Sequence, residues 1–322
     1  MYIHWLDEID LEQEFLVGGK AKNLARLLRS GIPVPPGFCV NVQAYQDLAN
    51  RQGVEATARH LLDGLNPDDF RQLSSVSAAL QELFLTAESM PRAWQEVAEA
   101  YAGLGRKVDS LTPSVAVRSS ATAEDLPEHS FAGQHDSYLG VIGHQSTLER
   151  VRQCWASLWN PQAIHYRHTR GIDHYQVSMA VVVQPMIPAT CAGVLFTANP
   201  VMGNRSEALI NASWGLGESV VSGLIEPDTF LVDKASGVVR ECTIGTKENL
   251  VELENGPGTR ETEVPEKLRD QVSLTDEEVK ELVSLAGAIE EIYQAPQDIE
   301  WAYAGNRLYI LQSRPITGLN KV

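Results

Sequence analysis

The sequence predicts an α/β protein in which a helix-rich first lobe, residues 1–180, precedes a β-rich second lobe, residues 181–322. Residues 42–110 follow amphipathic helical patterns with acidic outer faces, which are typical of a scaffold. From Ser178 onward, short apolar runs separated by Gly, Pro and Asn are typical of strands. With 322 residues, the chain is long enough for one large domain or for two lobes.

The charge and hydropathy of the chain exclude some classes of partner. The formal net charge of -16 argues against a nucleic-acid partner, because binding to a phosphate backbone rests on many Lys and Arg residues. A nucleotide held by a few local cations stays compatible with this charge. No apolar run approaches the roughly 20 residues of a membrane span, and the first residues lack the features of a signal peptide. We therefore expect a cytoplasmic protein without a membrane partner.

The four cysteines are far apart in the sequence. Cys39, Cys154, Cys191 and Cys242 form no CxxC pair and no Cys/His metal spacing, which argues against zinc and against a disulfide framework. We expect all four to be buried as small apolar side chains.

A Gly-Gly pair precedes the first predicted helix. Leu24, Leu27 and Leu28 recur at helical spacing, and Gly31 with Pro33 predicts the end of this helix. Glycines before a helix leave backbone N–H groups available to an anion, although Gly-Gly-Lys also occurs in ordinary turns. The chain contains no G-x-x-x-x-G-K-[ST] sequence, so this segment is not a P-loop.

A strand is predicted at Ser114–Arg118, followed by the small and hydroxylic residues 119–125, which we expect to form a mobile loop. Arg118 at the strand end is suited to holding a phosphate, but pairing with Glu124 or Asp125 is equally open from the residues alone.

The aromatic residues of the stretch 154–167 favour a helix that packs into the core. His135, His165 and His168 could suggest a catalytic role, but a solitary His is more often a surface or packed residue than a phosphate carrier.

The second half of the chain reads as strands that lead to one long helix. The apolar run Met179–Val183 indicates a strand covered on both faces. The polar residues 245–272 predict a surface loop, in which Lys247 is a candidate phosphate contact. Thr275 with Glu278 forms a capping box that predicts the start of the helix.

The chain ends in a predicted hairpin over residues 297–317, with its turn at 304–306. If the pairing register is even, Glu300, Gln312 and Arg314 share one face. The other face is then expected to carry Trp301, Tyr303, Tyr309 and Leu311. A carboxylate and an amide oxygen are ligands that Mg²⁺ accepts beside substrate phosphates, and a neighbouring Arg can clamp phosphate. A polar face that merely meets water is the alternative.

Three stretches resemble the signatures of one family, in that family's order. They are GGKAKNLARLLRSGIPVPPGFCV near the start, VRSSATAEDLPEHSFAGQHDSYLGV in the middle, and DIEW with LYILQSRPIT at the end. The chain is similar to the ATP-binding domain of the phosphoenolpyruvate synthase, pyruvate phosphate dikinase and rifampin phosphotransferase family. The resemblance covers essentially the whole chain and implies a two-lobed ATP-grasp fold with ATP and Mg²⁺ between the lobes.

The resemblance also implies site residues. It implies that Glu300 and Gln312 bind the metal. It also implies that Lys20, Arg118 and Arg314 bind the phosphates, whose charge they would offset during transfer. Further ATP contacts are implied at Gly133 and Ser137 in the Gly-rich turn, at Gln184 beside the adenine and at Glu218 in the WGLGE turn. Gln184 could equally cap a neighbouring backbone group.

The family's chemistry implies the first half-reaction of a dikinase, in which ATP phosphorylates a histidine and AMP and phosphate are released. No Gly-Gly-x-x-Ser-His-like sequence occurs in the chain, so we expect a separate His-bearing swivel subunit as partner, or a carrier removed with the rest of a longer chain.

Several complete functions stay open. The leading hypothesis is the ATP-binding subunit of a split system like phenylphosphate synthase, acting on a phenol, alcohol or other small acceptor. The alternatives are the ATP-binding part of a phosphoenolpyruvate synthase or rifampin phosphotransferase, and a nucleotide-sensing subunit that transfers nothing. The residues do not reveal the acceptor.

Overall fold

The computed structural model describes residues 1–10, 15–87, 90–122, 136–316 and 319. It has the mixed α/β composition that the sequence predicts. The chain forms two compact units, of which the first contains Met1–Ala25 and Pro36–Met186, and the second contains Arg26–Pro35 and Ile187–Val322. The assignment of 1–180 and 181–322 as two lobes stays a prediction. The strand that crosses residue 180 pairs entirely within the first unit.

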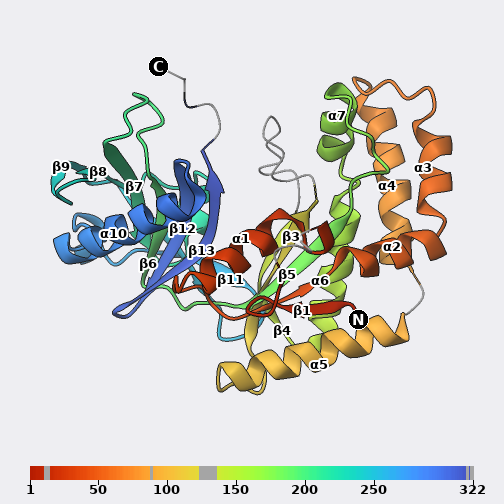
Figure 1. The fold of residues 1–322 in the computed structure, drawn as a ribbon, viewed down its shortest axis with the longest axis horizontal. Helices are drawn as coiled ribbons and strands as arrows, with labels where there is room; N and C mark the ends of the chain where they lie inside the picture. Colours follow the sequence, from red (N-terminus) through yellow and green to blue (C-terminus); the bar gives the residue numbers. More distant parts are fainter. Residues whose placement is uncertain (11–14, 88–89, 123–135, 317–318, 320–322) are drawn as a thin grey trace. The chain divides into compact units, whose positions relative to one another are not determined.

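Figure 1 shows the helices and strands of both units. The elements up to Met186 are β1 (Ile3–Trp5), α1 (Gly18–Arg29), β2 (Phe38–Val40), α2 (Val42–Arg51), α3 (Val54–Leu62), α4 (Phe70–Leu85), α5 (Pro91–Lys107), β3 (Ser114–Ala121), β4 (Ser137–Ile142), α6 (His144–Ser157), α7 (Pro161–Thr169) and β5 (Met179–Pro185). Those that follow are β6 (Cys191–Phe196), β7 (Glu207–Trp214), α8 (Glu218–Val221), β8 (Asp228–Asp233), β9 (Val239–Thr243), β10 (Asn249–Leu253), β11 (Thr259–Glu263), α9 (Glu266–Arg269), α10 (Asp276–Tyr293), β12 (Gln297–Ala304) and β13 (Arg307–Pro315).

The first unit is built on an antiparallel sheet with the strand order β1-β2-β5-β3-β4. Helices α2, α5 and α6 pack on this sheet, as Figure 1 shows. The helix-covered core contains Trp155 and Trp159 together with alternate apolar residues of β3 and β5, namely Val115, Val117, Ala121, Met179, Val181 and Val183. The predicted core position of these two tryptophans is therefore confirmed. Strand β5 is buried from Met179 to Gln184, so the prediction of a strand covered on both faces is also confirmed.

The loop expected at residues 119–125 was placed too early, because β3 continues to Ala121. Ser119 pairs with Val181, and Ala121 pairs with Met179. Ser119 and Ser120 are 3% and 0% exposed. Pairing with a fully buried apolar strand overrides the low strand preference of small hydroxylic residues.

The second unit contains a six-stranded antiparallel sheet with the order β13-β12-β6-β7-β8-β9. Helix α10 packs on β12, and its predicted capping box is confirmed in the contacts between Thr275 and Glu278. The core between them includes Leu195, Ile210 and Trp301, each 0% exposed.

The polar stretch 245–272 is not simply a surface loop, as the sequence suggested. Strands β10 and β11 form a two-stranded antiparallel hairpin within it. Val251 of β10 is buried, and its carbonyl oxygen accepts a 2.7 Å hydrogen bond from the backbone N–H of Leu216. This backbone contact attaches the hairpin to the turn that precedes α8.

Lys247 does not face a phosphate, because it lies in a buried ion pair. The ammonium group of Lys247 is 0% exposed, contacts the carboxylate of Asp228 and donates a 3.1 Å hydrogen bond to the carbonyl oxygen of Gly245. The same carboxylate accepts hydrogen bonds from the Gly245 N–H at 3.0 Å and from the N–H and hydroxyl of Ser273, both at 2.7 Å. Asp228 therefore joins three segments of the second unit.

The cysteine expectation is wrong at one position. Cys39, Cys154 and Cys191 are buried as expected, but Cys242 is exposed. Cys242 lies on β9, which is at the edge of the sheet and has four exposed residues out of five.

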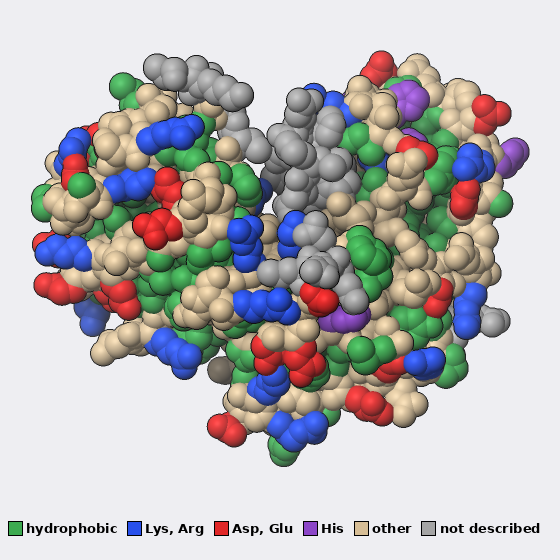
Figure 2. Space-filling view, viewed as in Figure 1, with side chains coloured by type: hydrophobic (Ala, Val, Ile, Leu, Met, Phe, Trp, Pro, Cys, Tyr) green, Lys and Arg blue, Asp and Glu red, His purple; other side chains and the backbone are tan. Residues whose placement is uncertain are grey.

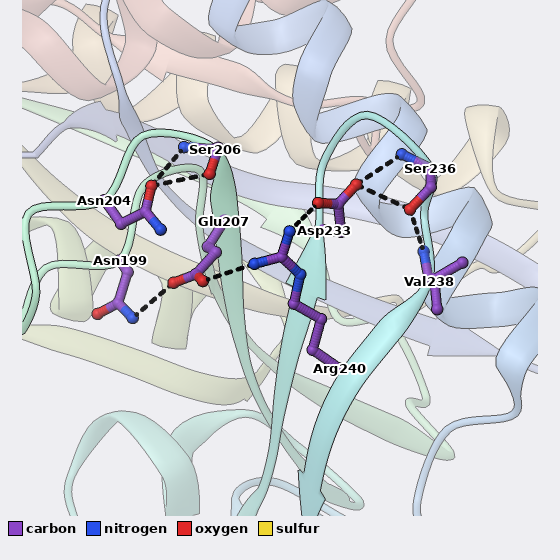
Figure 3. Close-up of polar contacts among 8 residues, drawn as sticks. All are labelled: Asn199, Asn204, Ser206, Glu207, Asp233, Ser236, Val238 and Arg240. Atoms are coloured by element: carbon purple, nitrogen blue, oxygen red, sulfur yellow. Dashed lines mark hydrogen bonds and ion pairs between the residues drawn. The ribbon is translucent and has the colours of Figure 1, made fainter.

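A polar cluster closes one end of the strands β7, β8 and β9 (Figure 3). Arg240 lies between two carboxylates, with its guanidinium 3.1 Å from Glu207 and in contact with Asp233. Asn199 donates a 3.2 Å hydrogen bond to the other oxygen of Glu207. This arrangement fixes the turn between β8 and β9 and uses Arg240 for structure.

Within the described residues, no helix combines the length and hydropathy that crossing a membrane requires.

The Asp228 network gives a testable prediction about stability. Replacing Asp228 with Ala leaves the Lys247 ammonium buried without its counter-charge, so we expect a loss of about 3–5 kcal/mol in the free energy of unfolding. The double variant Asp228→Ala/Lys247→Met removes both charges and should be less destabilised than Asp228→Ala alone. Urea denaturation followed by circular dichroism measures both. Equal losses in the two variants would show that the buried charge is not the cause.

Candidate functional site

Two of the predicted phosphate-binding cations come close together in the first unit. Lys20 lies in the first turn of α1, and its ammonium group donates a 2.7 Å hydrogen bond to the carbonyl oxygen of Ser119. Ser119 directly follows Arg118 on β3. The side chain of Lys20 is thus held at the strand position next to Arg118.

The register of the sheet places three predicted ATP contacts on one face. Arg118 pairs with Ser137 on β4 and with Val182 on β5, and Gln184 pairs with Ala116. Directly opposite residues in antiparallel strands project to the same face, and so do residues two positions apart on one strand. Arg118, Ser137 and Gln184 therefore share the face opposite the helix-covered core.

These three side chains differ in burial. Ser137 is exposed, Arg118 is half-buried, and Gln184 is only 4% exposed. Gln184 fits because Gly37 has no side chain: a Cβ added to Gly37 would lie 2.6 Å from the Cγ of Gln184 and 2.7 Å from the carbonyl oxygen of Val183. The glycine of the PVPPGF segment therefore makes room for this amide.

Gly133 lies outside the described residues, as does His135. Glu124 and Asp125, the alternative partners considered for Arg118, lie outside them too. The implied contact of Gly133 with ATP stays a prediction.

In the second unit, the terminal hairpin has the even register that the expected site requires. Glu300 of β12 pairs directly with Gln312 of β13, and Asp298 pairs with Arg314. The carboxylate, the amide and the guanidinium therefore project to one face of the sheet. These residues are half-buried.

The residues expected on the opposite face of the hairpin are partly wrong, because the register shifts between Glu300 and Trp301. Beyond this bulge Trp301 pairs with Ile310, and Tyr303 pairs with Leu308. The buried apolar residues of β13 are consequently Leu308 and Ile310, while Tyr309 and Leu311 are half-buried. A bulge places two residues of one strand opposite one of the other, which exchanges the faces of the residues that follow.

Asp298 is a functional candidate that sequence reasoning missed. Its carboxylate accepts a 2.8 Å hydrogen bond from the Nε of Arg314, and the second contact of the guanidinium is 2.7 Å long. Burial raises the pKa of the Asp298 carboxyl, and Arg314 opposes that shift. The signal in the sequence was its spacing, because Asp298 stands two residues before Glu300 and so shares its face.

The face of the sheet that carries Glu300 continues across β6, β7 and β8. Glu300 also pairs with Val194 on β6. Val194 in turn pairs with Asn211 on β7, and Asn211 pairs with Thr229 on β8. The hydroxyl of Thr229 donates a 3.3 Å hydrogen bond to the side-chain oxygen of Asn211. Core residues such as Ile299 and Trp301 lie on the other face, toward α10.

Glu218 occupies a different part of the second unit. It is exposed at the first position of the short helix α8, which packs against β6 and β7. The structure gives it no contact that identifies a ligand, and its implied role stays a prediction.

The residues of this face fit a hard divalent cation. Glu300 and Gln312 offer a carboxylate and an amide oxygen from directly paired positions, which is the type of donor set that Mg²⁺ accepts. On the side of the molecule that Figure 2 draws, basic and acidic side chains are interspersed.

Comparison with known proteins gives the family. The family model "Pyruvate phosphate dikinase, AMP/ATP-binding domain" matches residues 14–322. A probable phosphoenolpyruvate synthase of Archaeoglobus fulgidus is 42% identical over 321 residues, which are 100% of this chain and 42% of that protein.

Two further relatives are a second phosphoenolpyruvate synthase and a rifampicin phosphotransferase. A probable phosphoenolpyruvate synthase of Methanocaldococcus jannaschii is 41% identical over 99% of this chain and 27% of that protein. A rifampicin phosphotransferase of Streptomyces sviceus is 41% identical over 99% of this chain and 36% of that protein. The chain spans less than half the length of these curated relatives. With its full-length match and the signature hairpin in place, the chain belongs to the pyruvate phosphate dikinase family of AMP/ATP-binding domains.

Proposed function

We propose that this chain binds Mg-ATP in an ATP-grasp type of fold and supplies the phosphoryl group of an AMP-forming phosphotransferase. The observation that carries the proposal is the hairpin register, which pairs Glu300 with Gln312 and Asp298 with Arg314 on one face. This face joins two oxygen donors for a metal to a guanidinium for phosphate. The names of the relatives, phosphoenolpyruvate synthase and rifampicin phosphotransferase, support a phosphotransferase activity.

The proposed chemistry needs positioned charge more than a covalent nucleophile. Phosphoryl transfer is catalysed mainly by orienting the reactants and neutralising the charge that spreads over the phosphate oxygens. Lys20, Arg118 and Arg314 are proposed to neutralise that charge. Glu300 and Gln312 would hold Mg²⁺, which when bound contributes further neutralisation of the phosphates.

The other predicted contacts would set the orientation of the nucleotide. Ser137 is the direct cross-strand neighbour of Arg118 and is suited to donate a hydrogen bond to a phosphate oxygen. Gln184 offers an amide donor and acceptor that match the edge of a base. Asp298 would orient the guanidinium of Arg314, because it occupies the Nε side of that group.

The proposed acceptor is a histidine outside residues 1–322, on a His-bearing swivel subunit or a further part of the polypeptide. Its ring nitrogen would attack the β-phosphorus of ATP, so that a P–N bond forms while the P–O bond to AMP breaks. Water would then cleave the remaining phosphoanhydride bond, so that phosphate is released and phosphohistidine is left. The phosphohistidine would then supply a small acceptor. A split phenylphosphate synthase-like system with a phenol or alcohol, a phosphoenolpyruvate synthase and a rifampin phosphotransferase would all share this half-reaction.

The hairpin can be tested through the metal dependence of ATP binding. Because Glu300 and Gln312 would meet the phosphates through Mg²⁺, we expect ATP to bind at full strength only with the cation, and Glu300→Gln to remove most of this gain. Isothermal titration calorimetry in chelator-treated buffer, with and without Mg²⁺, measures the difference. Glu291→Gln, an exposed position on α10, is the matched control. Equal affinities of the unaltered chain with and without Mg²⁺ would exclude the metal role.

Arg118 provides a test of the phosphate role. We expect Arg118→Ala to lower the transfer rate by about 10²–10³-fold, as removal of a transition-state electrostatic group typically does, with little loss of folding stability. Arg118→Lys should rescue poorly because the two-pronged guanidinium is lost. Arg106→Ala, at an exposed position on α5, serves as control. A variant Arg118→Ala that is unfolded at room temperature would make this Arg structural.

The carrier histidine can be located by labelling. Transfer needs the receiving nitrogen within about 3–3.5 Å of phosphorus and in line with the leaving group, a geometry suited to a histidine on a mobile partner. With ATP labelled at the β-phosphate, we expect no label on this chain alone, and label on an added His-bearing subunit with release of AMP. Gels run under alkaline conditions preserve phosphohistidine. Stoichiometric label on the isolated chain would place the carrier among its own histidines, and binding without any transfer would favour a nucleotide sensor.

A further inference from the structure

The start of helix α1 is attached to strand β3 by one buried side chain, that of Ser120. Ser120 is 0% exposed. Its hydroxyl donates a 2.9 Å hydrogen bond to the carbonyl oxygen of Val17 and accepts a 3.2 Å hydrogen bond from the N–H of Ala21. A hydroxyl has one donor and two acceptor sites, so a single group can bracket the helix start in this way.

The opposite side of this contact is Gly18, which has a positive φ of 70°. A Cβ at Gly18 would overlap the carbonyl oxygen of Ser120 and lie 2.7 Å from its hydroxyl. Only a residue without a side chain allows the helix to approach the strand so closely, and the positive φ adds a second reason for glycine. Gly18 and Ser120 are therefore two halves of one contact between segments about 100 positions apart.

This contact adjoins both candidate phosphate-binding cations of the first unit, Lys20 and Arg118. Lys20 comes one residue before Ala21, whose N–H is bound by Ser120, and Arg118 comes two residues before Ser120 on the same face of β3. The ammonium of Lys20 also reaches the carbonyl oxygen of Ser119 at 2.7 Å. The position of Lys20 relative to Arg118 is thus set by the Ser120 hydroxyl from one side and by Gly18 from the other.

We propose that Ser120 is a positioning residue that sets the distance between Lys20 and Arg118 and thereby fixes where the phosphates of ATP bind. This inference rests on the proposed function, since it takes Lys20 as a phosphate ligand. Ser120 itself is fully enclosed and acts through the helix start. Removing its hydroxyl leaves the charge of both cations intact and changes only their spacing.

The test is a double-mutant cycle on nucleotide affinity, measured by calorimetry with Mg-ATP and with adenosine. We expect Ser120→Ala to weaken ATP binding by about five- to tenfold, the factor that one misplaced hydrogen-bonding group commonly costs. Adenosine, which has no phosphates, should bind with nearly unchanged affinity. In the background of Lys20→Met, which itself weakens ATP binding, Ser120→Ala should have no further effect.

Two additional variants separate positioning from general stability. Gly18→Ala perturbs the same contact from the helix side and should also weaken ATP more than adenosine. Ser77→Ala removes another buried hydroxyl of the first unit, which donates a 2.7 Å hydrogen bond to the carbonyl oxygen of Trp159, and should leave both affinities unchanged. Hydrogen exchange at the Ala21 amide should accelerate in Ser120→Ala and confirms without any ligand that the contact is lost.

The outcomes distinguish this inference from the function on which it rests. If Lys20→Met weakens ATP binding but Ser120→Ala acts equally in both backgrounds, or weakens adenosine as much as ATP, the positioning role is refuted and the phosphate role of Lys20 stands. If Lys20→Met leaves ATP affinity unchanged, the phosphate role of Lys20 fails and the inference fails with it.

Discussion

A single register shift in the terminal hairpin allows its polar candidate site residues and its apolar core residues to lie on opposite faces of the sheet. Between Gln297 and Glu300 the pairing of β12 with β13 is even, which places Asp298 beside Arg314 and Glu300 beside Gln312. The bulge after Glu300 changes the pairing, so that Leu308 and Ile310 enter the core with Trp301. Without the bulge, β13 would have to bury Tyr309 and Leu311. The polar residues and the apolar residues of the hairpin could then not all lie on their own faces.

Three basic residues of the second unit differ in burial and in their carboxylate partners. Lys247 is enclosed with Asp228 and contributes to the internal network of the second unit. Arg240 is taken up by Glu207 and Asp233 at the end of the sheet (Figure 3). Arg314 pairs with the carboxylate of Asp298, and its side chain is 42% exposed, so its guanidinium retains access to solvent. The charge of Lys247, which is enclosed in the core with its partners, costs too much to rearrange for catalysis.

In the first unit, the position of the candidate site residues depends on two glycines that allow neighbouring segments to pack closely. Gly18 and Gly37 stand at positions where a methyl group would collide with Ser120 or with Val183 and Gln184. Both glycines lie in the same sequence motif as Lys20. The motif therefore contains a candidate phosphate-binding residue together with glycines that allow close backbone packing. The chemistry of such a site depends on residues that touch no ligand, because small displacements of a charged group change its interaction with phosphate strongly.

The sequence by itself determined the α/β class, most of the helices and strands, the terminal hairpin and, through the family resemblance, the identity of an ATP-binding domain. These features depend on short-range periodicity, turn residues and contiguous motifs, which are local properties of the chain. It did not determine that Ser119–Ala121 continue a strand, that Asn249–Leu253 and Thr259–Glu263 pair, or that Asp298 accompanies Arg314. Only the tertiary structure decided these points, and it also decided that Lys247 is buried while Lys20 is half-exposed. The physical reason is that register, burial and ion pairing depend on partners far along the chain, which no local pattern specifies.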